Sequence, residues 1–210
     1  MMTSYFASVN NMKKLTLNRK EIIDEDITSL AQYQEGWCPP NFMSWDKEAG
    51  TTEYKLYSYL AKQVGGKMVL DIGTLFGGSA LALSTSDKNV ISYDLMSIET
   101  HQPGALDKNN IILRVADFME DEIEYDLVDL IVIDVDPHDG LQEPPMIEFL
   151  VDMGFKGLII LDDIHLSPEM EQMWNNFEYE KHDATEVGHF SGTGILNIGN
   201  KFELDFVSGE

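Results

Sequence analysis

The sequence predicts a doubly wound α/β fold, in which helices cover both faces of a mostly parallel sheet. Three observations predict it. Short β-rich apolar runs recur along the chain, the stretches between them are mostly long enough for helices, and each run ends in aspartate. Parallel strands are buried on both faces, so their runs are continuous in apolar residues rather than alternating. With 210 residues, 43% of them hydrophobic, the chain is large enough to bury one such core.

The predicted domain comprises residues 51–210. Its first element is a helix that begins after the capping pair Thr51 and Thr52 and ends at Gly65-Gly66. Residues 1–50 form an amino-terminal extension, which we expect to be a lid or a substrate-binding region. Five strand-like runs follow the helix. They are 68–70 ending at Asp71, 90–93 ending at Asp94, 111–116 ending at Asp117, 130–133 ending at Asp134, and 157–161 ending at Asp162 and Asp163.

The aspartates that end these runs should lie at one edge of the sheet, because right-handed crossovers bring the carboxyl ends of parallel strands together. Any one of them could be only a turn former or a helix cap. Five together indicate a functional rim, since ligands of open α/β sheets bind outside the carboxyl ends of the strands.

A glycine-rich turn, residues 71–79, connects the first run to a helical pattern. Gly73 permits a tight turn, and Gly77 and Gly78 let a ligand approach the backbone closely. Asp94 is placed to accept hydrogen bonds from the ribose of an adenosine ligand. No register of the three glycines gives the dinucleotide fingerprint G-x-G-x-x-G. An acid at Asp71 also suits the cationic S-adenosylmethionine better than the pyrophosphate of NAD.

This turn resembles the first motif of class I S-adenosylmethionine-dependent methyltransferases, in particular the metal-dependent catechol, caffeoyl-CoA and macrocin-type O-methyltransferases. Their pattern, acid-x-Gly-x-x-x-Gly-x-Ser, is matched by Asp71, Gly73, Gly77 and Ser79. The resemblance covers about residues 51–200 and implies a Rossmann-like, seven-stranded sheet with an antiparallel last strand. It also implies that Asp117 contacts adenine.

The same resemblance implies a metal site at Asp134, Asp162 and Asp163. Three carboxylates at one point would repel one another unless a cation joined them. Oxygen ligands alone favour Mg²⁺, with Mn²⁺ or Ca²⁺ as alternatives. Such an ion would bind a substrate hydroxyl and lower its pKa. The alternative is that Asp163 is only a turn residue at the end of its strand.

The proton acceptor departs from the family pattern, because the catechol enzymes place a lysine shortly after the first metal aspartate and this chain has none there. His138, His165 or Asp134 could take its place, although either histidine could also be a simple turn residue. The loop at residues 189–194 links two strand-like runs, 179–187 and 195–198. This loop could reach the rim, although a structural turn is the favoured interpretation.

The formal net charge of −23 argues against nucleic acid or a membrane as partner, since an acidic surface repels phosphate groups. The single cysteine, Cys38, cannot form an internal disulfide, which predicts a reducing compartment. We find no secretory signal and no apolar stretch of the roughly 20 residues that span a bilayer. The expected location is therefore the cytoplasm.

The sequence thus predicts an S-adenosylmethionine-dependent O-methyltransferase that uses a divalent metal and acts on a small hydroxylated acceptor. A sugar or polyol is favoured over a catechol. The alternatives are a nicotinamide-dependent oxidoreductase on a similar fold, a non-catalytic binding protein built on a methyltransferase fold, and related chemistry such as hydroxylation on the same scaffold. Whether the chain forms a homo-oligomer stays open.

Overall fold

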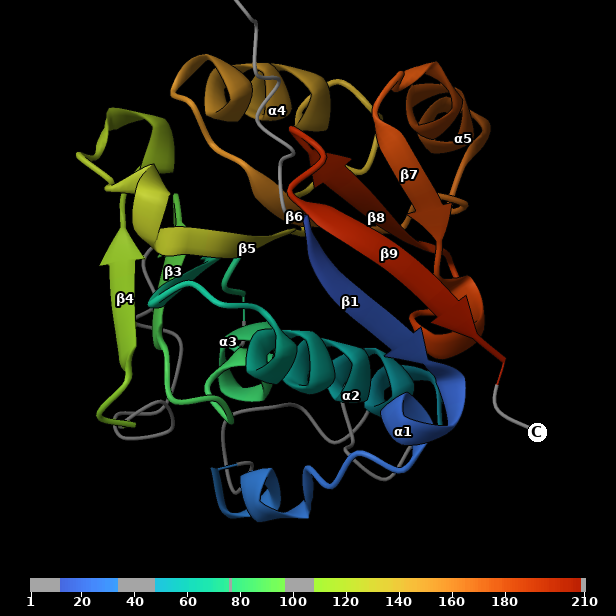
Figure 1. Ribbon diagram of the computed structural model, residues 1–210. Coiled ribbons are helices and arrows are strands. Elements are labelled where there is room, and N and C mark those ends of the chain that lie inside the picture. Colours follow the sequence, from blue (N-terminus) through green and yellow to red (C-terminus); the bar gives the residue numbers. More distant parts are fainter. Residues whose placement is uncertain (1–11, 34–47, 76, 97–107, 209–210) are drawn as a thin grey trace, which may run out of the picture.

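The computed structural model describes residues 12–33, 48–75, 77–96 and 108–208. Its centre is a seven-stranded sheet with the order β4-β3-β2-β5-β6-β8-β7 (Figure 1). The strands from β2 to β6 pair in parallel, and β8 is antiparallel to both of its neighbours. The predicted doubly wound, mostly parallel sheet is therefore confirmed. The strands are β2 (Met68–Ile72), β3 (Asn89–Asp94), β4 (Ile111–Val115), β5 (Val128–Ile133), β6 (Gly157–Asp162), β7 (Glu180–Asp183) and β8 (Thr193–Ile198).

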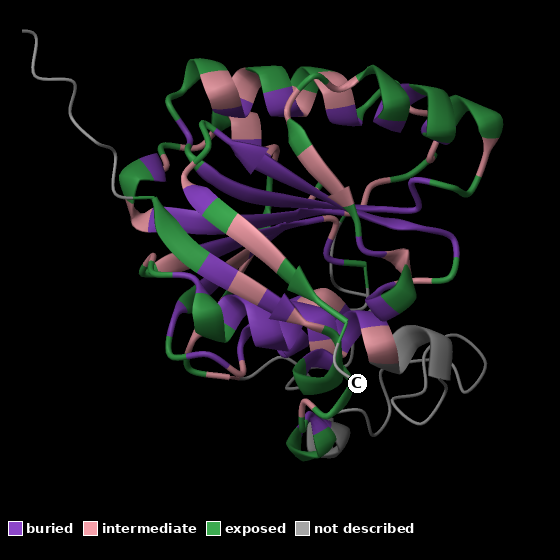
Figure 2. Ribbon diagram, turned by 45° about the vertical axis from the view of Figure 1, so that its right-hand side comes forward, coloured by how far each residue is buried: buried purple, intermediate pink, exposed green. Residues whose placement is uncertain are grey.

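Helices lie on both faces of this sheet. The helices α2 (Glu48–Gln63) and α3 (Gly78–Leu83) cover one face, and α4 (Glu143–Asp152) and α5 (Pro168–Asn176) cover the other (Figure 1). The central strands β2, β5, β6 and β8 are almost entirely buried (Figure 2). Helices α4 and α5 have exposed outer surfaces, whereas α3 has no exposed residue. Helix α2 begins at Glu48, before the expected start after Thr51 and Thr52.

Side chains of the central strands alternate between two hydrophobic clusters. Leu130, Val132, Leu158 and Ile160 pack with residues of α2 and α3. Their neighbours Ile131, Ile133, Ile159 and Leu161 pack with residues of α4 and α5. This alternation follows from the two-residue period of a strand, and it determines which face each aspartate at a strand end reaches.

The described part of the amino-terminal extension packs on the domain. Strand β1 (Lys13–Asn18) pairs in parallel with β9 (Phe202–Val207), and α1 (Arg19–Ile23) follows it. Leu15, Leu17 and Ile22 are buried in the cluster that contains α2. The remaining elements are the short 3-10 helices η1 (Thr28–Tyr33), η3 (Phe118–Glu120), η4 (Tyr125–Leu127) and η5 (Thr185–Val187).

The predicted role of residues 1–50 as a lid or substrate region stays a prediction. Cys38 lies outside the described residues. No helix in the part of the chain that the structure describes is long and apolar enough to cross a bilayer.

Candidate active site

The glycine-rich turn is fixed between the ends of two neighbouring strands. Backbone N–H groups of Gly73 and Thr74 donate to the carbonyl oxygen of Tyr93 at the end of β3, at 2.9 and 3.1 Å. On the other side, a Cβ atom added to Gly73 would lie 1.6 Å from the carbonyl oxygen of Asp134, just after β5. Only glycine fits this position, where φ is +102°. The turn is therefore held closely between the ends of β3 and β5.

Asp71 lies directly beneath this turn and is only 1% exposed. Its Oδ2 accepts a hydrogen bond of 2.6 Å from the hydroxyl of Ser92, but its Oδ1 has no hydrogen-bond partner among the described residues. Burial raises the pKa of Asp71 to about 6, although hydrogen bonds from Ser92 and Ser79 oppose the rise. A buried carboxylate with an oxygen to spare is suited to a cationic group of a ligand.

Asp94 holds the turn to the neighbouring strand. Its Oδ2 accepts from the backbone N–H of Leu75 at 2.9 Å, and its Oδ1 accepts from that of Met96 at 2.8 Å. Asp117 lies beyond β4, where its side chain accepts from the N–H of Met119 at 2.9 Å and caps the short helix η3. The structure thus gathers Asp71, Asp94 and the glycine turn, whereas the expected contact of Asp117 with adenine stays a prediction.

The acids at the ends of β5 and β6 do not all point the same way. Asp134 continues the row of Leu130 and Val132, and Asp162 continues the row of Leu158 and Ile160, so both belong to the face that α2 covers. Asp163 instead has a left-handed backbone with φ of +59°, a conformation that aspartate tolerates better than most residues. This turn directs its carboxylate toward His138, His189 and Ser191.

A further carboxylate, Glu53 of α2, lies against these acids and is 7% exposed. It accepts a hydrogen bond from the hydroxyl of Tyr57. Burial, together with the charges of Asp162 and Asp134, raises the pKa of Glu53 well above its usual range. Burial and the charges of Asp162 and Asp163 likewise raise the pKa of Asp134. The carboxylates of this cluster therefore disfavour one another's charged forms.

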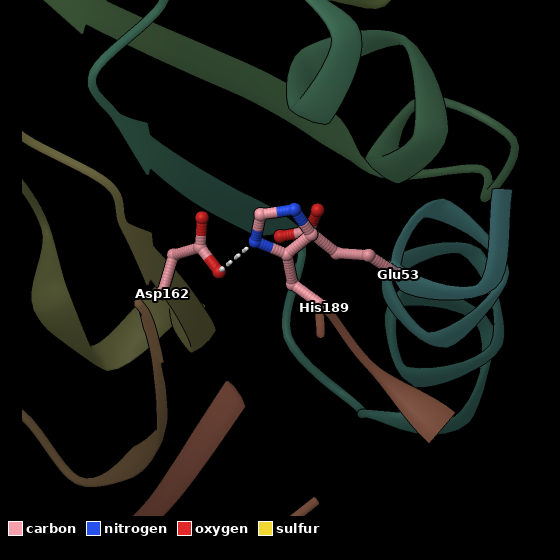
Figure 3. A group of neighbouring side chains, drawn as sticks. All are labelled: Glu53, Asp162 and His189. Atoms are coloured by element: carbon pink, nitrogen blue, oxygen red, sulfur yellow. Dashed lines mark ion pairs between the residues drawn. The ribbon is translucent and has the colours of Figure 1, made fainter. Parts of the chain in front are cut away.

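His189, in the loop before β8, supplies a positive charge. Its Nδ1 lies 3.2 Å from Oδ1 of Asp163. The same atom lies 3.6 Å from Oδ1 of Asp162, the ion pair drawn in Figure 3. The neighbouring carboxylates of Asp162 and Asp163 raise the pKa of His189 to about 10. Of the two interpretations of residues 189–194, the position of this side chain among the acids of the rim favours the one in which the loop reaches the rim.

The two histidines predicted as candidate bases lie in different places. His138 belongs to the rim, with Nδ1 3.5 Å from Oδ2 of Asp163 and Nε2 3.9 Å from Oδ1 of Asp134. His165 contacts other carboxylates, because its Nε2 lies 2.7 Å from Oδ2 of Asp183 and its Nδ1 3.6 Å from Oε1 of Glu171. The geometry therefore favours His138 over His165 as a base.

One group of side chains in the described chain is arranged to hold a metal ion. Glu53, Asp162 and His189 each offer one ligand atom, and these atoms lie within 4.8 Å of one another (Figure 3). Sequence reasoning missed Glu53, although it lies one helical turn before Tyr57 on the apolar face of α2. An acid on that face was the available signal. The predicted combination of Asp134, Asp162 and Asp163 shares only Asp162 with this group and stays a prediction.

No protein-family model matches the chain, and no curated protein matches it in sequence. Several solved structures are similar to it. SAH-bound PaMTH1, a methyltransferase of Podospora anserina, is 14% identical with a TM-score of 0.53, over 84% of this chain and 87% of that chain. A methyltransferase from Geobacter sulfurreducens is 15% identical with a TM-score of 0.54, over 82% and 88% of the two chains.

A third similar structure is cofactor-bound Rv0187 from MTB, which is 16% identical with a TM-score of 0.54, over 84% of this chain and 89% of that chain. At these identities the likeness concerns the fold alone. The strand order and the single antiparallel strand agree with it. The chain has the Rossmann-like fold of the class I methyltransferases.

Proposed function

We propose that the chain is an S-adenosylmethionine-dependent O-methyltransferase that acts, with the help of a divalent cation, on a small hydroxylated acceptor such as a sugar or polyol. The observation that carries the cofactor assignment is Asp71. Its carboxylate is buried, has one oxygen without a hydrogen-bond partner among the described residues, and lies beneath a turn that only glycine can form. That arrangement fits a ligand with a cationic end.

Different residues around the turn would bind different parts of the cofactor. Asp71 faces the cationic amino acid end, the backbone of the glycine turn allows close approach, and Asp94 is placed for the ribose hydroxyls. When bound, S-adenosylmethionine supplies a methyl group on a positively charged sulfur. The chain's own residues then orient the acceptor and remove its proton.

The acids at the ends of β5 and β6 would hold the cation. The sequence pattern predicts Asp134, Asp162 and Asp163 as its ligands and Mg²⁺ as the ion. A divalent ion there would lower the pKa of an acceptor hydroxyl. His138 contacts both Asp134 and Asp163, so it is placed to accept the proton. Positioning of the hydroxyl by these side chains supplies much of the acceleration in such reactions.

The cofactor assignment is tested by replacing Asp94 with alanine. We expect binding of S-adenosylhomocysteine to weaken by roughly 1–3 kcal/mol, because ribose hydroxyls lose their acceptor and the turn loses the hydrogen bond to Leu75. Isothermal titration measures the change. The control is Asp87→Ala, whose side chain is 98% exposed. Unchanged affinity in Asp94→Ala would contradict this placement, and binding of NAD(H) instead would favour the oxidoreductase alternative.

The cation assignment predicts that methyl transfer to a polyol or catechol acceptor stops in EDTA and returns when Mg²⁺ or Mn²⁺ is added in excess. In Asp134→Ala we expect no recovery, because the remaining rim has lost a carboxylate that faces the site. Binding of S-adenosylhomocysteine is the control and should persist in EDTA. Methyl transfer that is indifferent to the chelator would leave a metal-free methyltransferase, with His138 as its base.

A further inference from the structure

We propose that Glu53, Asp162 and His189 bind a divalent transition metal ion, and that Asp163 orients His189 instead of binding the ion. The inference refines the cation site of the proposed function and in that sense rests on it. Metal binding can nevertheless be measured without methyl transfer. The ligand set differs from the three aspartates in two of its members and adds a nitrogen donor.

The three side chains come from separate parts of the fold. Glu53 extends from α2, Asp162 ends β6, and His189 precedes β8. Their ligand atoms lie within 4.8 Å of one another (Figure 3). Three ligands bound to one ion at about 2.1 Å lie at most about 3.6 Å from one another. Side-chain shifts of up to about 1 Å would therefore close the group around an ion.

Asp162 provides an independent observation that points to a ligand. Its side chain is 7% exposed, and its Oδ1 makes no hydrogen bond to any described residue. Burying a carboxylate oxygen without a hydrogen-bond donor costs folding free energy. An unsatisfied oxygen at this position therefore indicates a binding partner. His189 Nδ1, at 3.6 Å, is too distant to serve as a hydrogen-bond donor. A metal ion bound to this oxygen would satisfy it, and Nε2 of His189 would be the nitrogen ligand, because Nδ1 pairs with Asp163.

The surrounding contacts are those that orient metal ligands. The hydroxyl of Tyr57 donates a hydrogen bond to Oε1 of Glu53 and so restricts the orientation of that carboxylate. His189 is held through Nδ1 by Asp163 at 3.2 Å and by the hydroxyl of Ser191 at 2.5 Å. Carboxylates and hydroxyls in such places set the direction of histidine and carboxylate ligands. In this role Asp163 is a positioning residue.

The donor set selects the ion. Mg²⁺ and Ca²⁺ prefer oxygen ligands alone, whereas one imidazole with two carboxylates suits Zn²⁺, Co²⁺, Mn²⁺ or Fe²⁺. The ion would also neutralise the carboxylates of Glu53 and Asp162. We therefore expect a preference for transition metals over Mg²⁺, which the three-aspartate site would not give.

The test is titration of the full chain with Co²⁺, Zn²⁺ and Mg²⁺ in separate experiments, in the absence of methyl donor. We expect one Co²⁺ or Zn²⁺ per chain, and binding of Mg²⁺ weaker by tenfold or more. His189→Gln and Glu53→Gln should each weaken Co²⁺ binding by on the order of 100-fold, and His189→Gln should also shift the visible absorption of bound Co²⁺. Asp163→Asn should weaken it by roughly 10–100-fold without that spectral shift.

The matched control is His165→Gln, since His165 pairs with Asp183 outside the group and its loss should leave Co²⁺ binding unchanged. Circular dichroism without metal verifies that each variant folds, and titration with S-adenosylhomocysteine tests the cofactor site separately. Absence of Co²⁺ and Zn²⁺ binding to the wild-type chain would overturn the inference. So would Mg²⁺ binding that Asp134→Ala abolishes and His189→Gln leaves intact. Loss of S-adenosylhomocysteine binding alone would overturn the methyltransferase assignment and leave the metal site standing.

Discussion

Replacing Gly73 with alanine is expected to cost more than about 4 kcal/mol of unfolding free energy, a large part of the roughly 5–15 kcal/mol typical of a domain. The new Cβ atom would lie 1.6 Å from the carbonyl oxygen and 2.7 Å from the carbonyl carbon of Asp134. Both are backbone atoms, so the clash can be relieved only by separating the ends of β2 and β5. Urea denaturation followed by circular dichroism measures the loss.

The chain offers a matched control at Gly154. This glycine also has a left-handed backbone, with φ of +85°, but a Cβ atom added there would meet no other atom within 4 Å. Gly154→Ala should therefore cost only the left-handed conformation itself, about 1–2 kcal/mol. If both variants lost the same unfolding free energy, the contact between β2 and β5 would not be the reason that position 73 requires glycine.

The second large effect concerns the pH dependence of stability and arises at Asp71. Because burial raises the pKa of this carboxyl from 3.8 to about 6, the folded state holds the proton more tightly than the unfolded state does. Its contribution therefore becomes unfavourable as pH rises from about 4 to 6 and reaches about 3 kcal/mol above that range. Asparagine at this position carries no charge and so no such penalty.

We therefore expect Asp71→Asn to gain about 3 kcal/mol relative to the wild-type chain between pH 4 and pH 7.5. Denaturation of both proteins at the two pH values measures this difference. The same variant should bind S-adenosylhomocysteine more weakly, because the ligand's ammonium group loses its counter-charge. Asp87→Asn, on the exposed surface, should gain nothing with pH. A stability difference that stays constant with pH would show that Asp71 does not titrate as its burial implies.

The positions of the rim aspartates could be predicted from the sequence alone, for a physical reason. Burial of a parallel sheet on both faces forces continuous apolar runs, and the first polar residue after each run marks the carboxyl end of a strand. Asp71, Asp94, Asp134 and Asp162 are found at or next to the strand ends where this argument places them. The glycine turn could be predicted in the same way. Glycine is required at position 73 by a contact between β2 and β5, which are adjacent strands of the sheet.

The choice between His138 and His165 needed the tertiary structure. Each histidine follows a rim aspartate by a few residues, so their sequence contexts are alike. The backbone then turns differently: His138 has a positive φ of 54° and contacts Asp134 and Asp163, whereas His165 contacts Asp183 of β7. The direction of a side chain after a strand depends on these backbone angles, which a local pattern of residue types does not specify.

Glu53 and His189 likewise became part of the rim only through packing. Local sequence determines the period, burial and end of each element, and it sufficed for the α/β class and for the strand-end acids. How closely α2 and the loop before β8 approach those acids depends on how the whole core packs, as does the pairing of β1 with β9 from opposite ends of the chain. The sequence by itself thus determined the sheet and its acidic edge. The tertiary structure decided which side chains share that edge, because distances between elements are set by contacts remote in the chain.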